Sequence, residues 1–127
     1  MENYGVVVNE VVNTGGLSLK NPTLMQIYAD VINKPMVVSD REQTCALGAA
    51  LLASVAAGAG TLQDLQRATV RYQEKVFQPI PENVAVYEKL FAIYSDLHDN
   101  LGNTDTTSNL SHVMKDLIAI REQVRSA

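Results

Sequence analysis

The chain has 127 residues, a length that fits a single domain with one hydrophobic core. Hydrophobic residues make up 46% of it and charged residues 19%, a mixture typical of folded proteins and unlike that of disordered chains. The formal net charge of −4 argues against nucleic-acid binding and against attraction to acidic membranes, because both depend on basic surfaces.

The cysteine content and the hydropathy of the sequence indicate the cellular compartment. Cys45 is the only cysteine, so an internal disulfide is excluded. It lies in an apolar helical run, which predicts a small buried side chain without metal-binding chemistry. The first residues lack the pattern of a signal peptide, and no run approaches the about 18 apolar residues of a membrane span. We therefore expect a cytoplasmic protein with no membrane partner.

The first half of the chain predicts a strand, a helix and a second strand. β-Branched residues at 6–12 indicate a strand that ends in a turn containing Gly15 and Gly16. Asn21 is a suitable N-cap for a helix over 22–33, whose helically spaced apolar residues are Leu24, Ile27, Tyr28, Val31 and Ile32. Residues 36–38 then form a short strand, so this region predicts a βαβ-like unit.

Two further helices follow the second strand. The first covers about residues 42–57, is rich in alanine and ends before Gly58, which suits a C′ position. The second begins at Thr61, where Asp64 completes an imperfect capping box, and extends to about Gln73. Small side chains on the first helix predict close packing against a neighbouring backbone.

The last part of the chain predicts two amphipathic helices joined by a polar segment. The helix over 81–101 carries an apolar stripe formed by Val84, Tyr87, Leu90, Phe91, Tyr94 and Leu97 or His98. Residues 103–111 have almost nothing to bury and are predicted to be a flexible linker or loop. The C-terminal segment 112–127 is expected to be an amphipathic helix, which begins at about Ser111 and ends at about Arg125.

The glycine turn is the most informative local feature. Glycines have no Cβ, so a ligand can approach the backbone closely, and a helix N-terminus offers free N–H groups with partial positive charge. A nucleotide could bind at Gly15 and Gly16 for these reasons. The spacing alone is weak evidence, because two glycines between a strand and a helix are most often only a turn.

Several polar side chains near this turn have alternative interpretations. Lys20 could direct its ammonium group to a phosphate, lie over an adenine ring or remain a solvated charge, and its position favours none of these. Gln26 and Asp30 lie four residues apart on one helix face, which we expect to be the solvated side.

No catalytic or metal-binding residue is predicted. The charged run at 40–42 is typical of a solvated loop. His98 and His112 are far apart in sequence and have no cysteine or carboxylate at ligand spacing, so neither indicates a metal site or a catalytic triad.

A family resemblance adds to these observations. The runs at Asn13–Pro35 and Glu42–Ala50 reproduce in order and spacing a pattern that resembles the ribulokinase branch of the FGGY carbohydrate kinases. The resemblance is clear over residues 6–58 and weaker through about 101. It implies that residues 1–102 are the adenosine-side half of the kinase's C-terminal domain.

The resemblance also implies a fold and a site. The fold would be α/β, a helix-rich fragment of an actin-like (ribonuclease H-like) ATPase domain with about two strands flanked by helices. In such kinases the Gly-Gly turn belongs to an adenosine-binding motif. Gly15 and Gly16 would approach the nucleotide, while Lys20 and Asn21 would border the adenosine pocket. Gly48 would contribute to tight helix packing behind that pocket.

The complete enzyme implied by the resemblance transfers the γ-phosphate of ATP, with Mg²⁺, to a ketopentose such as L-ribulose. The family's general base and sugar-binding residues precede the matched segment, so we expect the chain to supply adenosine contacts and to be inactive alone. Two alternatives stay open. One is a non-catalytic interaction or oligomerisation module, such as a kinase remnant, and the other is a generic nucleotide-binding domain. Exposed apolar faces would favour a homo-oligomer.

Overall fold

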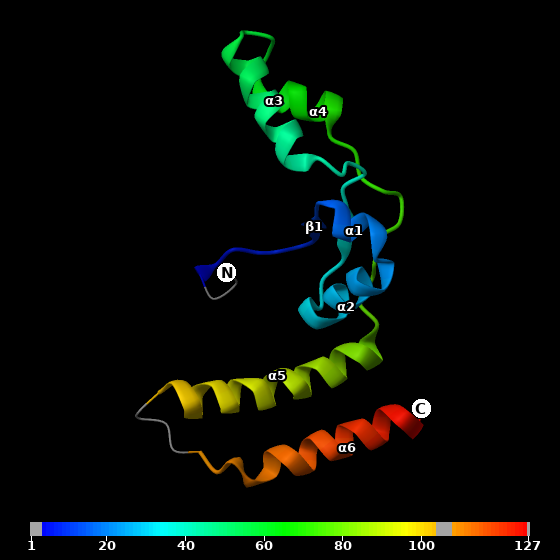
Figure 1. The fold of residues 1–127 in the computed structure, drawn as a ribbon, viewed down its shortest axis with the longest axis vertical. Helices are drawn as coiled ribbons and strands as arrows, with labels where there is room; N and C mark the ends of the chain where they lie inside the picture. The colour runs from blue at the N-terminus through cyan, green and yellow to red at the C-terminus, as the bar shows by residue number, and fades with distance from the viewer. Residues whose placement is uncertain (1–3, 104–107, 127) are drawn as a thin grey trace. The chain divides into compact units, whose positions relative to one another are not determined.

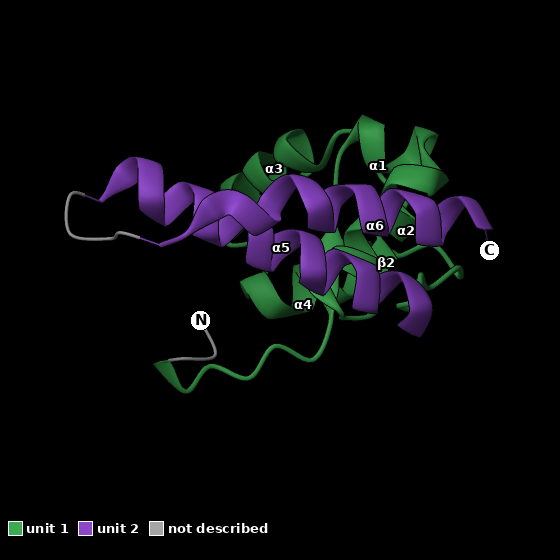
Figure 2. Cartoon of the chain, turned by 90° about the horizontal axis from the view of Figure 1, so that it is seen from below, with its two compact units in different colours: residues 1–79 green, residues 80–127 purple. Residues whose placement is uncertain are grey.

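The structure, a computed structural model, describes residues 4–103 and 108–126. The chain divides into two compact units, residues 1–79 and residues 80–127, which Figure 2 shows in green and purple. Residues 104–107 of the predicted linker lie outside the described residues. The division into units does not test the predicted end of the kinase domain at residue 102, which stays a prediction.

The centre of the first unit is a pair of parallel strands. β1 (Val11–Asn13) is followed by α1 (Gly16–Lys20), α2 (Pro22–Ile32) and β2 (Met36–Val38). Figure 1 labels the first three of these elements, and Figure 2 labels β2. The strands pair in the register Val11 to Met36, Val12 to Val37 and Asn13 to Val38. A parallel pair requires a crossover connection, and α1 and α2 supply it. The predicted βαβ-like unit is therefore confirmed.

The first strand is shorter than predicted. It begins at Val11, and Val6 and Val7 are 51% and 77% exposed. The strand is short because its partner is short. The pairing runs from the hydrogen bond that Val11 N donates to Pro35 O (2.9 Å) to the one that Ser39 N donates to Asn13 O (2.9 Å). A β-branched sequence forms a strand only where a neighbouring backbone can pair with it.

Helix α2 begins and ends as the sequence predicts, but its buried side differs. The Asn21 side chain accepts a hydrogen bond from Leu24 N (3.0 Å), which confirms it as the N-cap. The helix buries Met25 and Ala29, which join Met36, Val38 and Phe77 in the core. The helically spaced side chains that identified the helix are instead largely exposed, namely Ile27, Tyr28, Val31 and Ile32.

The predicted solvated face of α2 is wrong for one residue. Asp30 is 1% exposed, and Gln26 Nε2 donates to Asp30 Oδ1 (2.8 Å). The same amide nitrogen also donates to Gln78 O (2.8 Å). Gln26 therefore links the helix to the chain that precedes the second unit, and the burial of Asp30 has a structural cause that local spacing does not reveal.

Helix α3 (Thr44–Ala56) confirms the alanine-rich helix, and Gly58 follows its C-cap with φ of 77°. Its only buried residue is Leu51. Cys45 is exposed, so its predicted burial is wrong. Small apolar side chains specify a helix here, but within this chain most of them face solvent.

Helix α4 (Leu62–Thr69) begins at the predicted cap but ends earlier than predicted. Thr61 Oγ1 accepts from Asp64 N (3.2 Å). The chain then becomes extended at Val70, and Gln73 N donates to Val38 O (2.8 Å). Isolated antiparallel bridges join Ser39 to Tyr72 and Met36 to Phe77, so β2 is hydrogen-bonded on both edges. This pairing explains why the helix stops.

The second unit is a pair of helices. α5 (Pro81–Gly102) and α6 (Val113–Ser126), preceded by the 3₁₀ turn η2 (Leu110–His112), lie side by side (Figure 1). Both predicted helices are confirmed. The predicted stripe of α5 is only partly covered, because Phe91 and Tyr94 are 66% and 60% exposed. Across the described residues, no helix is long and apolar enough to cross a membrane.

Candidate functional site

The turn after β1 requires glycine at its first position. Gly15 has φ of 96° and ψ of 167°, a conformation that residues with a side chain essentially do not adopt. It precedes α1 directly, and Ser18 Oγ, which is buried, donates to Gly15 O (2.7 Å). The residues between the glycine turn and α2 therefore form this short helix, and Gly15 fixes its start.

Gly16 differs from Gly15 in its requirements. It has no positive φ, and a Cβ atom placed there would meet no other atom within 4 Å. The fold itself does not require glycine at this position. The space beside Gly16 is open, so its backbone is accessible to a ligand.

Lys20 and Asn21 occupy the junction between α1 and α2. Lys20 Nζ lies 3.6 Å from Glu42 Oε1, and both side chains are more than half exposed. Asn21 uses its side-chain oxygen as the cap of α2, so the amide group that could meet a ligand is held in a fixed orientation. Glu42 comes from the run predicted to be only a solvated loop, and the structure brings it to Lys20.

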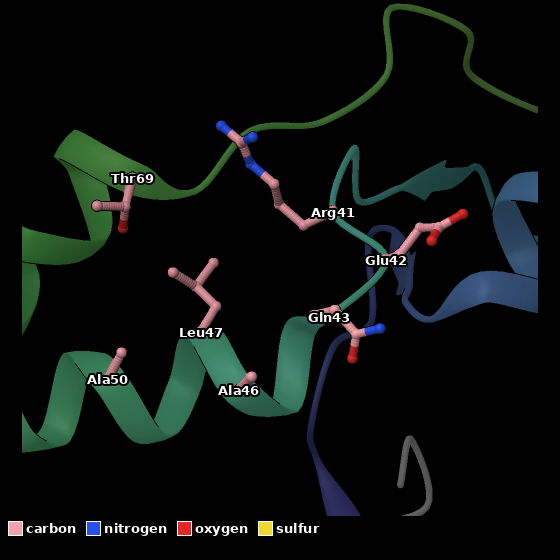
Figure 3. A pocket seen from close by; sticks show the side chains of 7 residues that line it. All are labelled: Arg41, Glu42, Gln43, Ala46, Leu47, Ala50 and Thr69. Carbon is pink, nitrogen blue, oxygen red and sulfur yellow. The ribbon is translucent and has the colours of Figure 1, made fainter.

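A cavity of about 480 Å³ lies where this loop meets α3 and α4. Figure 3 shows Leu47 and Ala50 of α3 on one side and Thr69 of α4 on the other, with Arg41 from the loop after β2. Its volume falls in the range of about 300–1,000 Å³ that small-molecule sites occupy. The complete lining is Arg41, Glu42, Gln43, Ala46, Leu47, Ala50 and Thr69.

A second cavity of about 240 Å³ lies at the carboxyl ends of the two strands. Thr14 follows β1 and Ser39 follows β2, and both line it. Ligands of open parallel sheets bind at this edge. The complete lining is Val12, Thr14, Ser39, Thr44, Leu47, Gly48, Leu51, Gln66, Val70 and Tyr72. Gly48 therefore lines a cavity, and a Cβ atom placed there would meet no other atom within 4 Å, so the tight helix packing predicted for it is not present within the described part of this chain.

The predicted site residues lie next to the two cavities but do not line them. Neither lining contains Gly15, Gly16, Lys20 or Asn21. Thr14 precedes the glycines and Glu42 contacts Lys20, so each cavity has one direct link to the predicted residues. Ligands of parallel sheets bind at the carboxyl ends of the strands, so this rule indicates residues 39–44; the sequence analysis had interpreted 40–42 as only a solvated loop.

In residues 4–103 and 108–126, no group of three or more His, Cys, Asp or Glu side chains is placed to hold a metal ion. The strand ends present the hydroxyl groups of Thr14 and Ser39, which suit hydrogen bonding to an uncharged ring or a ribose.

The fold and the turn define a class: a helix-rich α/β fragment with a parallel strand pair and a glycine turn at its carboxyl edge. Two solved structures share this architecture, a ligand-bound xylulose kinase and a gluconate kinase, both from Lactobacillus acidophilus. Each has a TM-score of 0.64 and 30% identity, covering 76% of this chain and 19% of that protein. These likenesses support an actin-like α/β fragment.

Sequence comparisons show which family the chain is similar to. Residues 1–57 match the C-terminal domain of the FGGY family of carbohydrate kinases. The chain is 40% identical to the ribulokinase of Anoxybacillus flavithermus, over 94% of this chain and 22% of that protein. Identity to the ribulokinase of Mycolicibacterium smegmatis is 44%, over 97% of this chain and 22% of that protein.

The chain therefore resembles the C-terminal part of a ribulokinase-like member of the FGGY carbohydrate kinases. It spans about a fifth of the length of the curated relatives that it matches. Those matches cover nearly all of this chain, so the similarity extends past residue 102, where sequence analysis found none.

Proposed function

We propose that this chain is the adenosine-side C-terminal segment of an ATP-dependent carbohydrate kinase. The observation that carries the proposal is the turn at Gly15 and Gly16, which lies at the carboxyl edge of a parallel strand pair and within the stretch that matches the FGGY C-terminal domain. The complete enzyme would phosphorylate L-ribulose or a related ketopentose in the cytoplasm. The ribulokinase relatives support this choice of sugar.

Each proposed site residue has a separate role. Gly15 holds the turn, and Gly16 lets the nucleotide approach its backbone from the open side. Lys20 borders the nucleotide with its ammonium group, which Glu42 keeps at the same edge. Asn21 positions its amide by capping α2. These are binding contacts, and none of them transfers a proton or a phosphoryl group.

ATP and Mg²⁺ are the proposed cofactors of the complete enzyme. A magnesium ion would neutralise phosphate charge and orient the γ-phosphate during transfer. Since the described part of this chain has no cluster of metal ligands, the protein ligands of the ion would come from elsewhere in the enzyme. The sugar and the general base would likewise be held outside these residues, so we expect no turnover by the chain alone.

Two other functions are less well supported. A purely structural interaction module does not account for similarity to ribulokinases along nearly the whole chain. A generic nucleotide-binding domain would bind ATP equally well but would not restore sugar phosphorylation in a kinase. The decisive experiment must therefore measure transfer.

A chimeric enzyme tests the proposal. This chain would replace the matching C-terminal segment of the Anoxybacillus flavithermus ribulokinase, and ATP-dependent phosphorylation of L-ribulose would be measured. Restored activity, together with an inactive enzyme truncated before the same segment, supports the proposal. A chimera that folds and binds L-ribulose but neither binds ATP nor turns over would contradict it.

Calorimetry of the 127-residue chain asks a narrower question. Titration with Mg-ATP and with L-ribulose, after light scattering has established the oligomeric state, compares nucleotide and sugar binding. Heat from ATP and none from the sugar indicates that the adenosine wall is preformed in this segment. Binding of the sugar alone would contradict the assigned role.

A further inference from the structure

The last residue of β1 is unusual for a strand. Valine occupies positions 11 and 12, but position 13 is asparagine, which strands disfavour. Asn13 pairs with Val38 in the parallel register, and Ser39 N donates to Asn13 O (2.9 Å), so its backbone is a regular part of the sheet. The reason for an asparagine at this position must therefore lie in its side chain.

The side chain of Asn13 reaches into the core of the first unit. Its Nδ2 atom lies 3.2 Å from Met25 Sδ and 3.9 Å from Met36 Sδ. Both methionines are 1% exposed and belong to the core cluster around β2. A half-buried amide group thus contacts two apolar side chains that are fully enclosed.

These contacts do not make asparagine a favourable choice for stability. A thioether sulfur is only a weak acceptor, so the NH₂ group recovers little of the hydration that it loses on burial. A β-branched apolar side chain would suit the strand and would pack against the same methionines. Residues that break such local rules are expected where the geometry of a functional site depends on them.

The oxygen of the same amide holds the turn. Asn13 Oδ1 accepts a hydrogen bond from Thr14 N (2.9 Å), which is the first backbone N–H group after the strand. Because that group is a donor, the amide oxygen must face it, and the NH₂ group is thereby directed to the sulfurs. The core therefore fixes the orientation of the amide, and the amide fixes the direction in which the chain leaves β1.

The turn is held from its other side by Ser18. The buried Ser18 Oγ donates to Gly15 O (2.7 Å), so the chain between Asn13 and Gly15 is fixed at both ends. Gly16 follows directly, and the space beside it is open. Its backbone is thus presented to that space by two side chains that themselves face inward.

We propose that Asn13 is a positioning residue of the nucleotide site: its amide ties the turn to the core and thereby sets where the backbone of Gly16 meets the nucleotide. This role rests on the nucleotide site proposed above. Asn13 itself does not touch the nucleotide, because its side chain is engaged with the core and with Thr14 N. Positioning groups matter because a displacement of about 1 Å can lower a rate about a hundredfold.

Two substitutions at Asn13 separate positioning from packing. Asn13→Val removes the hydrogen bond to Thr14 N but suits the strand and the core, so the midpoint of its urea unfolding in the 127-residue chain should equal or exceed that of the parent. Asn13→Asp keeps the acceptor for Thr14 N but places a charge against two sulfurs, so its midpoint should be lower. The effects on nucleotide binding should have the opposite order.

The KM for ATP of the chimeric ribulokinase is the deciding measurement. We expect Asn13→Val to raise it about tenfold or more and Asn13→Asp to raise it less than about threefold, with the KM for L-ribulose unchanged in both. An unchanged KM for ATP in Asn13→Val would overturn the proposal, and so would an equal increase in the two variants. A urea midpoint of Asn13→Val below that of Asn13→Asp would also overturn it, because the side chain would then serve the core alone.

Phe77→Leu is the matched control for a weakened core. Phe77 belongs to the same core but pairs with Met36 on the edge of β2 away from β1. This variant should lower the urea midpoint and leave the KM for ATP unchanged. An increase in KM as large as that of Asn13→Val would overturn the proposal, since any loosening of the core would then displace the turn.

Gly16→Val in the same chimera distinguishes the role of Asn13 from the proposed function. If Gly16→Val raises the KM for ATP and Asn13→Val does not, the turn lies against the nucleotide and only the positioning role is overturned. If neither variant raises it, the nucleotide site is not at this turn, and the proposed function fails together with the role of Asn13.

Discussion

The two glycines of the turn should respond in opposite ways to the same substitution. Gly15 has φ of 96° and ψ of 167°, so alanine there must adopt a conformation that costs about 1–3 kcal/mol. Gly16 has no positive φ, and an added Cβ meets nothing within 4 Å. Alanine at Gly16 should therefore be neutral or stabilising by about 0.4–1 kcal/mol, because it reduces the freedom of the unfolded chain.

The two variants should consequently differ by about 1–4 kcal/mol in the free energy of unfolding. Urea unfolding followed by far-ultraviolet circular dichroism measures this difference. With a slope of about 1–2 kcal/mol/M, the midpoint of Gly15→Ala should lie at least about 0.5 M below that of Gly16→Ala. The reasoning is refuted if the two midpoints coincide or if Gly16→Ala is the less stable protein.

Four further variants test the packing and the site edge. Asn21→Ala removes the cap of α2 and should lower the free energy of unfolding by about 1 kcal/mol in urea, whereas an unchanged midpoint would show that the cap contributes nothing. Met25→Ala in the core should lower the free energy of unfolding by about 2–5 kcal/mol, and Ile27→Ala on the exposed side by less than about 1 kcal/mol. The reverse order of stability in thermal unfolding would contradict the observed burial. Lys20→Ala should change stability by less than about 1 kcal/mol, because its pair with Glu42 is exposed, yet raise the KM for ATP in the chimera; an unchanged KM would remove Lys20 from the site.

Local signals explain why most helices and both strands were predictable. Caps and helix-breaking residues act on the backbone beside them, so they indicate the ends of helices even when the tertiary structure is not known. Here these residues are Asn21 with Pro22, Pro35 and Gly58. The boundaries that failed depend on distant pairing. Within the part of the chain that the structure describes, residues 6–10 have no partner strand, and the chain after Thr69 leaves the helix to pair with β2.

Burial was less predictable than helix formation. Periodicity identified α2, but it did not show that Met25 and Asp30 face the core while Tyr28 faces solvent. The exposure of Cys45 has the same origin, because an apolar helix is buried only where another element covers it.

The part of the candidate site that lies within one short motif was predictable from the sequence. Gly15, Gly16, Lys20 and Asn21 are consecutive or nearly so, and the resemblance assigned them together. The pairing of Lys20 with Glu42 joins residues on opposite sides of α2 and β2 in sequence, so no local pattern indicated it. The roles of these residues in nucleotide binding stay a prediction.

The KM for ATP of the chimeric ribulokinase carrying Gly16→Val tests the central claim most directly. Valine fills the open space beside the turn, so the account predicts a marked increase in the KM for ATP, with the KM for L-ribulose unchanged and the fold intact by circular dichroism. An unchanged KM for ATP in a folded, active variant would contradict the proposal that this turn lies against the nucleotide.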